Sequence, residues 1–442
     1  MTGWFGLVLV AAAMMASGRP AAAADEPLRV SGTGPAAGAE AYYQWLTGCL
    51  DAIEKDLPKF TRSAEAAARL YVDGGSEIGA YGGDPFVLEL FGRSGGVMRM
   101  LAFDKFANRK EAPSLPDKAI ALVGLREDRI DEIVGKITEF RKKGYHVVVF
   151  GRADLVDKAR KAHADVEVDT HAAPHGGLLQ DANGRWIIPT DSAAASAASW
   201  TWVSEFVAAC TRLGKMPPMY LGYAVEGAME REARFKGLKF HDKLASRLDA
   251  GQLSKQFLSE LRRSLEAIHD LELPRIRQTA AEALKTRSSG GKLWVYLQGH
   301  EILRLMGYPN DPQWFEPIHQ GWNTMRQDVK IGPSDFILCI GFDQIFQGER
   351  WEGFAERTRK AGAKIAWSIT DYRPEEVKAI PSGEVFINQH WAKGDAVAEV
   401  PKYDIKCIPT SGVIAEAVLW MVHAEMLKQQ GDAASRRPAT TH

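Results

Sequence analysis

The chain has little of what marks several classes of protein. Its net charge is −1 over 442 residues, so no basic surplus points to a nucleic-acid partner. After the N-terminus, no apolar run approaches the roughly 20 residues that span a bilayer. No cofactor motif is present. What remains is an ordinary globular composition, 45% hydrophobic and 25% charged.

Cysteine is also scarce, with 4 residues that neither pair closely nor follow metal-ligand spacing. Cys339 and Cys407 stand in apolar, strand-like runs and are expected to be buried thiols. Cys49 and Cys210 both fall on expected helices of the first half. Export of the protein would allow these two to form a disulfide, and the sequence leaves this open.

The N-terminus has its own pattern. Trp4–Ala16 is apolar, and Ala22 and Ala24 fit a small-residue cleavage site. This predicts a signal peptide over residues 1–24 and an exported protein, periplasmic or secreted, with no stable membrane insertion after cleavage. No Lys or Arg precedes the apolar run, so an uncleaved anchor is the alternative, and a disordered Ala-rich leader is another.

The rest of the chain repeats itself. Pro189-Thr190-Asp191-Ser192 leads through an Ala-rich segment to Trp200, and Pro409-Thr410-Ser411-Gly412 leads through a similar one to Trp420. Each is preceded by a strand-like run that ends in histidine, His171 or His390. A period of roughly 220 residues is too long for a solenoid unit. The repeat therefore predicts two copies of one domain, facing each other across a pseudo-twofold axis.

Within each copy, short apolar runs alternate with helical patterns, which is typical of a parallel sheet covered on both faces. The predicted strands are Ala68–Val72, Ile120–Val123, His146–Phe150 and Val166–Asp169, then Leu293–Tyr296, Phe336–Ile340, Lys364–Trp367 and Val385–Ile387. The predicted helices are 38–68, Asp128–Lys143, Asp154–His163, Ser196–Leu213 and Val413–Leu427. The predicted domains are 40–240 and 270–428, joined by a helical connector at 241–269 and followed by a disordered tail at 429–442.

Two segments resemble a known family. Tyr71-Val72-Asp73-Gly74-Gly75-Ser76 is similar to the first phosphosugar loop of the sugar isomerase (SIS) domain. His390 to Ala396, followed by Pro409-Thr410-Ser411-Gly412, is similar to the end of that domain in uncharacterised bacterial members. The resemblance implies two tandem flavodoxin-like three-layer α/β sandwiches with five-stranded parallel sheets, packed as a pseudodimer. It also implies a small sugar derivative, a phosphosugar or amino sugar, at the carboxyl ends of the strands.

A candidate anion site follows from this resemblance. Gly74 and Gly75 allow successive N–H groups to converge, and the Ser76 hydroxyl adds a donor. The alternative is a tight turn in which Ser76 is only a helix cap. The family's second loop usually carries a pair of hydroxyl residues, which are missing from both Val123–Arg129 and Ile340–Gln344. Arg126 could supply the lost anion contact, or it belongs to a solvated run of charges. The two loops together predict one anionic-ligand site, in the first copy.

Further candidates lie at matching places in the two copies. His171 and His390 are candidate acid–base or sugar-hydroxyl contacts, or histidines bonded to nearby backbone. His300 replaces Ser76 in the second copy, as a base or a capping group. His175 could join His171 on a metal, but no third ligand is evident, so no metal is predicted. The helix starts offer further anion contacts, although capping alone explains them; these residues are Thr190, Asp191, Ser192, Thr410 and Ser411.

Three functions remain open on the sequence. The first is a non-catalytic module that binds a carbohydrate derivative, which the missing hydroxyl loops and the predicted export favour. The second is an aldose–ketose isomerase with His171, His390 or Glu226 as its base; Glu226 follows the last helix of the first copy and could reach the cleft between the copies. The third is a structural envelope protein with vestigial sites. A homo-oligomer stays open for all three.

Overall fold

A computed structural model of the chain describes residues 37–104, 114–222, 225–243, 246–300, 305–321, 324–326, 328–341, 349–370 and 380–435. The signal peptide predicted over residues 1–24 and the second-copy loop residues 342–344 lie outside this part of the chain.

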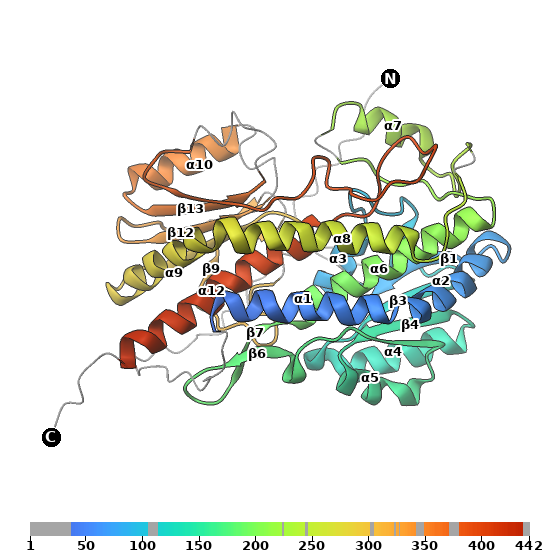
Figure 1. Cartoon of the computed structure of the whole chain (residues 1–442), viewed down its shortest axis with the longest axis horizontal. Coiled ribbons are helices and arrows are strands. Elements are labelled where there is room, and N and C mark those ends of the chain that lie inside the picture. Colours follow the sequence, from blue (N-terminus) through green and yellow to red (C-terminus); the bar gives the residue numbers. More distant parts are fainter. Residues whose placement is uncertain are drawn as a thin grey trace.

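The first half contains one parallel sheet between layers of helices (Figure 1). Its elements are α1 Ala39–Lys55, α2 Leu57–Val72, β1 Glu77–Tyr81, α3 Asp84–Leu90, β2 Met100–Ala102, β3 Ala119–Gly124, α4 Ile130–Lys142, β4 His146–Gly151, α5 Ala153–Ala159, β5 Val166–Asp169, β6 Gly177–Gln180, β7 Trp186–Pro189 and α6 Asp191–Arg212. The sheet order is β2-β1-β3-β4-β5, which is the flavodoxin-like order.

The second half repeats this order in the sheet β9-β8-β12-β13-β14. Its elements are α8 Gln252–Ala267, α9 Leu273–Ser288, β8 Leu293–Leu297, β9 Glu316–Pro317, β10 His319–Gly321, β11 Thr324–Met325, β12 Phe336–Ile340, α10 Glu349–Lys360, β13 Lys364–Ile369, β14 Val385–Asn388 and α12 Ser411–Ser435, with α7 Ala228–Phe235 lying between the halves in sequence. The predicted pair of five-stranded parallel sheets is therefore confirmed.

The duplication is also visible in the backbone. Ile188 and Ile408, which precede the two Pro-Thr segments, both have left-handed φ values, 67° and 66°. This conformation is an outlier for a β-branched residue. Ile188 N–H donates to the carbonyl of Asn310 in the second half (3.0 Å), and Ile408 N–H donates to the carbonyl of Gly95 in the first (2.8 Å). Each half thus holds the other at the equivalent place, as a pseudo-twofold axis requires.

The halves also exchange their first helices. Helix α2 packs on α6 and α9 packs on α12, each within its own half, whereas α1 packs on α12 and α8 packs on α6 across the junction. Figure 1 shows α1 and α8 running beside each other along the molecule. Helix α8 therefore takes the place in the second copy that α1 has in the first, although 241–269 was predicted to be a connector.

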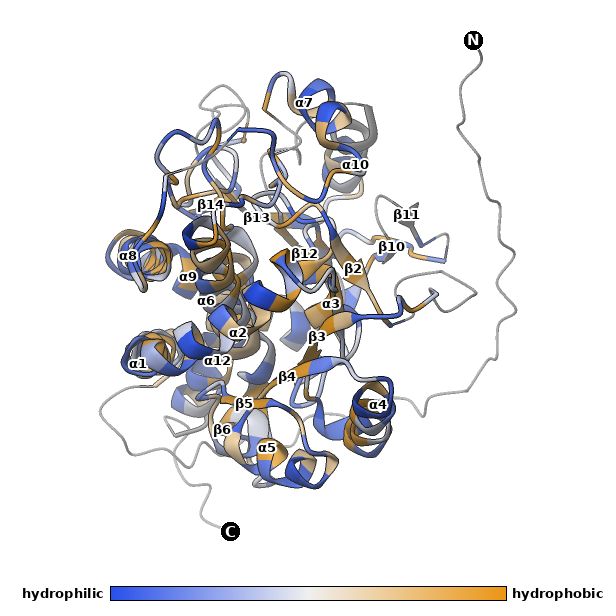
Figure 2. Ribbon diagram, turned by 90° about the vertical axis from the view of Figure 1, so that its right-hand side faces the viewer, coloured by the Kyte–Doolittle hydropathy of each residue, from blue (hydrophilic) through white to orange (hydrophobic). Residues whose placement is uncertain are grey.

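A continuous core explains why the halves do not separate. Apolar side chains of α1, α2, α6, α8, α9 and α12 form one buried cluster with residues of both sheets. Figure 2 shows the hydrophobic strands lying between helices with hydrophilic outer faces. Trp200 on α6 and Trp420 on α12 are fully buried and belong to this core. Burying such a side chain contributes on the order of 2–3 kcal/mol.

Two local predictions were wrong, and the disulfide that the sequence left open is absent. Residues 68–72 belong to helix α2, because the Ala-rich sequence before them continues a helical stripe of buried residues through Tyr71. Helix α12 runs to Ser435, so the part of 429–442 that the structure describes is helical. Cys49 and Cys210 are both buried free thiols and do not pair with each other.

Candidate functional site

Because 68–72 is helical, the predicted anion loop lies at the wrong edge of the sheet. Gly74 N–H donates to Arg69 O (3.2 Å) and Ser76 N–H donates to Leu70 O (3.1 Å), which is the pattern of a helix C-terminus. Ser76 precedes β1, whereas Arg126 follows β3, and the two strands run parallel in register. Five residues of strand separate the two edges by about 17 Å. Ser76 and Arg126 therefore do not form one cradle.

The loop at the carboxyl end of β1 is instead Gly82-Gly83, which leads into α3. Both residues have positive φ values, 131° and 109°, and a Cβ on Gly82 would lie 2.1 Å from Gly124 O. Glycine is needed there because two backbones meet. Gly83 N–H donates to Asp104 Oδ2 (3.1 Å), which also accepts from Arg129 Nη1 (3.1 Å). A carboxylate of the chain thus occupies part of this anion-binding backbone.

Arg126 lies beside this loop. Its guanidinium pairs with Asp128 through Nε and Nη2 (3.0 and 2.7 Å), and its centre is 4.8 Å from the ring of Tyr308, a residue of the second half. A cavity of about 10 Å³ lies here, close to the smallest that holds a water molecule. It is lined by Gly82, Phe86, Gly124, Leu125, Arg126, Ser192, Ala195, Ser196 and Tyr308.

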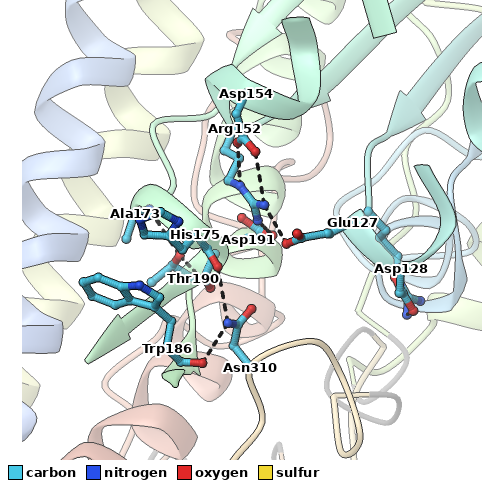
Figure 3. Close-up of polar contacts among 12 residues, drawn as sticks. Glu127, Asp128, Arg152, Asp154, Ala173, His175, Trp186, Thr190, Asp191 and Asn310 are labelled. Atoms are coloured by element: carbon cyan, nitrogen blue, oxygen red, sulfur yellow. Dashed lines mark hydrogen bonds and ion pairs between the residues drawn. The ribbon is translucent and has the colours of Figure 1, made fainter. Parts of the chain in front are cut away.

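A second arginine, Arg152, forms ion pairs with three carboxylates near the start of α6 (Figure 3). It contacts Glu127, Asp154 and Asp191 at 2.6, 2.6 and 2.8 Å, and its side chain is 3% exposed. Burial raises the pKa of Asp191 to about 6, while the charge of Arg152 acts in the opposite direction. Asp191 is therefore held inside the protein by an internal cation.

The hydroxyls at the start of α6 also have internal partners. Thr190 Oγ1 donates to Gly176 O (3.1 Å) and accepts from Ala173 N–H (3.2 Å). Ser192 Oγ donates to Glu416 of the second half. Thr190 therefore fixes the segment that enters the helix, and Ser192 joins the cavity to the junction between the halves.

The backbone N–H groups at the start of α12 find their hydrogen-bond acceptor in a different way. Asp395 accepts from the N–H groups of Thr410 (3.2 Å) and Ser411 (2.8 Å) and from Ser411 Oγ (2.7 Å). Arg93 of the first half then pairs with Asp395 (2.7 Å) and donates to Ser411 Oγ (2.6 Å). An internal carboxylate and an internal cation thus occupy the helix N-terminus of the second copy.

The two matching histidines bind to acids at helix junctions. His171 Nε2 lies 3.2 Å from Asp56, between α1 and α2, and His390 Nε2 lies 3.2 Å from Glu272, between α8 and α9. Both histidines have left-handed φ values, 58° and 55°. They occupy equivalent places, and each one ties the end of a strand to the helix pair that precedes its sheet. Neither lines the cavity beside Arg126.

His300 and Glu226 lie apart from that cavity as well. His300 Nδ1–H donates to Leu88 O (3.0 Å), and burial lowers the pKa of its imidazole well below the usual range. It is a neutral ring that joins the second half to α3 of the first. Glu226 stands in an exposed turn before α7 and makes no hydrogen bond or ion pair to the residues that the structure describes.

Sequence reasoning missed two buried glutamates at the junction. Glu89 Oε1 accepts from Arg93 Nε (3.2 Å) and Trp200 Nε1 (2.8 Å), and Glu416 Oε1 accepts from Trp420 Nε1 (2.9 Å) and from Ser192. Burial raises the pKa of Glu89, and it raises that of Glu416 to about 7. Their signal in the sequence was a carboxylate between apolar neighbours, in Val87-Leu88-Glu89-Leu90 and in Ala415-Glu416-Ala417.

The chain was compared with known families, curated proteins and solved structures. No family model matches the chain, and no curated protein does. Among solved structures, the C-terminal domain of glucosamine-fructose-6-phosphate aminotransferase from Francisella tularensis is similar at 8% identity and a TM-score of 0.47, over 88% of this chain and 96% of that one. A putative phosphosugar isomerase from Silicibacter pomeroyi has 11% identity and a TM-score of 0.47, over 89% and 98%. One from Clostridium difficile has 7% identity and a TM-score of 0.47, over 89% and 94%.

The chain's own sheets show the expected tandem arrangement, with two five-stranded parallel sheets of the same strand order. Two further findings concern only the part that the structure describes. No group of three or more His, Cys, Asp or Glu side chains is placed there to hold a metal ion. No helix in the same ranges is long and apolar enough to cross a membrane.

Proposed function

We propose that the protein is a non-catalytic binding protein for a small anionic carbohydrate derivative, held at the carboxyl edge of the first sheet. The proposal rests on the weak ion pair of Arg126. Among the residues that the structure describes, Arg126 forms its ion pair with Asp128, whose side chain is 46% exposed. An exposed ion pair is worth about 1 kcal/mol or less, so a ligand anion can replace Asp128 at little cost.

The surroundings of Arg126 suit a phosphorylated or carboxylated sugar. A guanidinium fork matches the oxygens of a phosphate or carboxylate. Ser192 and Ser196 line the same cavity and could meet sugar hydroxyls, and the Tyr308 ring offers a flat apolar surface. The cavity is too small for a sugar as it stands, so ligand entry requires Arg126 to leave Asp128 and Tyr308 to shift. Tyr308 belongs to the second half, which makes the binding site a shared one.

The positions of the three candidate bases support binding without turnover. Of the three bases considered on the sequence, His171 and His390 contact acids at helix junctions and Glu226 is exposed, and none of them lines the cavity. Proton abstraction needs a base within hydrogen-bonding reach of the proton. Anchoring and proton transfer use different groups, so binding can persist without catalysis.

One observation favours an aldose–ketose isomerase as a second candidate. Glu416 contacts Ser192, which lines the cavity, and its pKa of about 7 suits proton transfer at neutral pH. In this alternative, Ser192 would move aside and expose the carboxylate to a bound sugar.

The proposed site is tested first, by measuring ligand affinity with calorimetry. A thermal-shift screen of sugar phosphates and cell-wall amino-sugar phosphates selects the ligand, since bound ligand stabilises the fold. We expect Arg126→Ala to weaken its binding at least tenfold, because a charge-assisted hydrogen bond contributes about 1.5–3 kcal/mol. Arg141→Ala, at an arginine that pairs with Asp165 away from the cavity, is the matched control and should bind normally.

The same ligand is then incubated in D2O and examined by NMR. We expect no deuterium at C1 or C2 of the sugar. Deuterium incorporation that disappears in Glu416→Gln would instead assign the isomerase. Unchanged affinity in Arg126→Ala would reject the proposed site.

We also propose export, with the mature protein beginning near Asp25. N-terminal sequencing of the protein from its native host tests this, and recovery of intact Met1 in the soluble cytoplasm would rule it out.

A further inference from the structure

A second candidate site lies on the hairpin between β5 and α6, where the two copies differ. At two consecutive left-handed positions the first copy has His175-Gly176 and the second has Gly394-Asp395. Their equivalence is set by one shared hydrogen bond: Gly176 N–H donates to Ala173 O, and Asp395 N–H donates to Ala392 O, both at 3.0 Å. Each copy thus uses one glycine and one strained non-glycine residue.

The strain at Asp395 has an internal explanation. Its carboxylate accepts from Thr410 and Ser411 and pairs with Arg93, so its contacts offset the left-handed backbone. The strain at His175 (φ 67°) has no such explanation. Its imidazole is exposed, and among the described residues its ring nitrogens make no hydrogen bond. Strained residues persist where the surrounding structure or a function requires them.

The His175 ring has one intramolecular partner, the indole of Trp186. The two rings stack with centroids 5.0 Å apart and planes at 23°. Trp186 is 36% exposed, and Figure 3 shows its indole directed away from the Arg152–Asp191 cluster. In the second copy the equivalent of Trp186 is Lys406, because Ile187 and Cys407 both occupy the matching place in the returning strand. The exposed aromatic pair therefore belongs to the first copy alone.

The second half holds this pair in place. Asn310 Nδ2 donates to His175 O (3.3 Å) and to Trp186 O (2.9 Å). Asn310 is two residues from Tyr308, which closes the Arg126 cavity. Arg185, which precedes Trp186 in the chain, pairs with Asp181 at 2.8 Å, so these two charges offset each other. The result is a fixed, neutral aromatic surface with an amide and an imidazole at its edge.

We propose that His175 and Trp186 form a platform for one pyranose ring of a neutral glycan, a site separate from the Arg126 cavity. The C–H bonds on one face of a pyranose carry partial positive charge and pack on an indole, while its hydroxyls meet polar side chains at the edge. The platform consists of two stacked side chains, an imidazole and an indole. A protein partner would need a surface of about 800 Å². The unbonded imidazole nitrogens supply the hydroxyl contacts.

The second copy supplies the variants for the test. Chitotriose and cellotriose are titrated by calorimetry into the full-length protein at millimolar concentration. We expect one or both to bind, and Trp186→Ala and Trp186→Lys to raise Kd at least tenfold. His175→Gly, which installs the residue of the second copy, should raise Kd at least fivefold without lowering the melting temperature, because it relieves the left-handed strain. Leu271→Ala, at an exposed apolar residue elsewhere, is the control for surface hydrophobicity and should bind normally.

Several outcomes would overturn the platform. The first is that neither trisaccharide binds, and the second is that the Trp186 variants bind as tightly as the wild type. The third is a lower melting temperature in His175→Gly, which would show that the imidazole is structural. Arg126→Ala should bind the neutral trisaccharides as the wild type does. The two proposals can therefore be tested separately, since the platform does not depend on Arg126 and the anionic site does.

Discussion

Arg93 of the first half and Asp395 of the second form a buried ion pair, with Nη1 and Oδ2 2.7 Å apart and side chains 4% and 10% exposed. Arg93 also contacts Glu89 and Ser411, so one guanidinium joins α3 of the first half to the start of α12. The pair ties the two halves together at the point where a ligand anion would otherwise meet the helix N-terminus.

Removing this cation should therefore destabilise the whole molecule. We expect Arg93→Met to lower the free energy of unfolding by about 3–5 kcal/mol, because it leaves buried carboxylates uncompensated. Arg160→Met, at an arginine whose side chain is 64% exposed, should leave the stability nearly unchanged, because exposed ion pairs contribute little. Denaturant unfolding of both variants provides the measurement, and equal small losses would contradict the role given to Arg93.

The stability that Glu416 and Asp191 contribute should fall as pH rises from about 4.5 to 7. The pKa of Glu416 is raised to about 7 and that of Asp191 to about 6, so the folded protein holds protons that the unfolded chain releases. A raised carboxyl pKa gives stability that is present below the unfolded pKa and lost as pH rises through the folded value. Glu416→Gln should flatten this slope in melting temperatures recorded across the range, and a slope unaffected by the substitution would exclude Glu416 as its source.

The two histidines offer a matched test of a structural role. His171→Ala and His390→Ala each remove one contact to an acid at a helix junction, so each should lower the free energy of unfolding by about 1 kcal/mol. Ligand affinity should stay unchanged in both, as measured by calorimetry. If only one of the two variants loses ligand binding, that histidine is a ligand contact and its role is not purely structural.

Two glycines should respond differently to the same substitution. Gly82→Ala places a Cβ 2.1 Å from Gly124 O at a φ of 131°, whereas a Cβ on Gly75 meets nothing within 4 Å at a φ of 71°. We expect Gly75→Ala to cost about 1–2 kcal/mol, the usual penalty of the left-handed region, and Gly82→Ala to cost clearly more. Comparable unfolding midpoints for the two variants would contradict the close approach of β1 and β3.

The repeat predicted the fold well because it fixes pairs of elements at once. The strands over 119–124 and 336–340 and the equivalence of His171 with His390 follow from patterns that occur twice. The first strand was misplaced because Glu77–Tyr81 has a glycine at its centre and little β-branched character, while the Gly-Gly-Ser turn before it resembles a functional loop. Two Gly-Gly pairs, at 74–75 and 82–83, compete within ten residues, and only the position of the strand decides between them.

The candidate site was harder to predict because half of it comes from far along the chain. Arg126 was identified from its own loop, but Tyr308, Glu416 and Arg93 reach their places only through the pseudo-twofold packing of the halves. No local pattern reports such contacts. The internal carboxylates Asp104 and Asp395, which occupy anion-binding backbone, were hidden for the same reason.

Hydrogen exchange with and without the best-binding sugar phosphate tests the central claim most directly, namely that the anionic ligand sits at the carboxyl edge of the first sheet and is shared by both halves. The account predicts slower exchange on ligand binding at 81–84, at 125–129 and at 305–311 of the second half, with no change at 73–76. Protection confined to 73–76, or absent from 305–311, would contradict it.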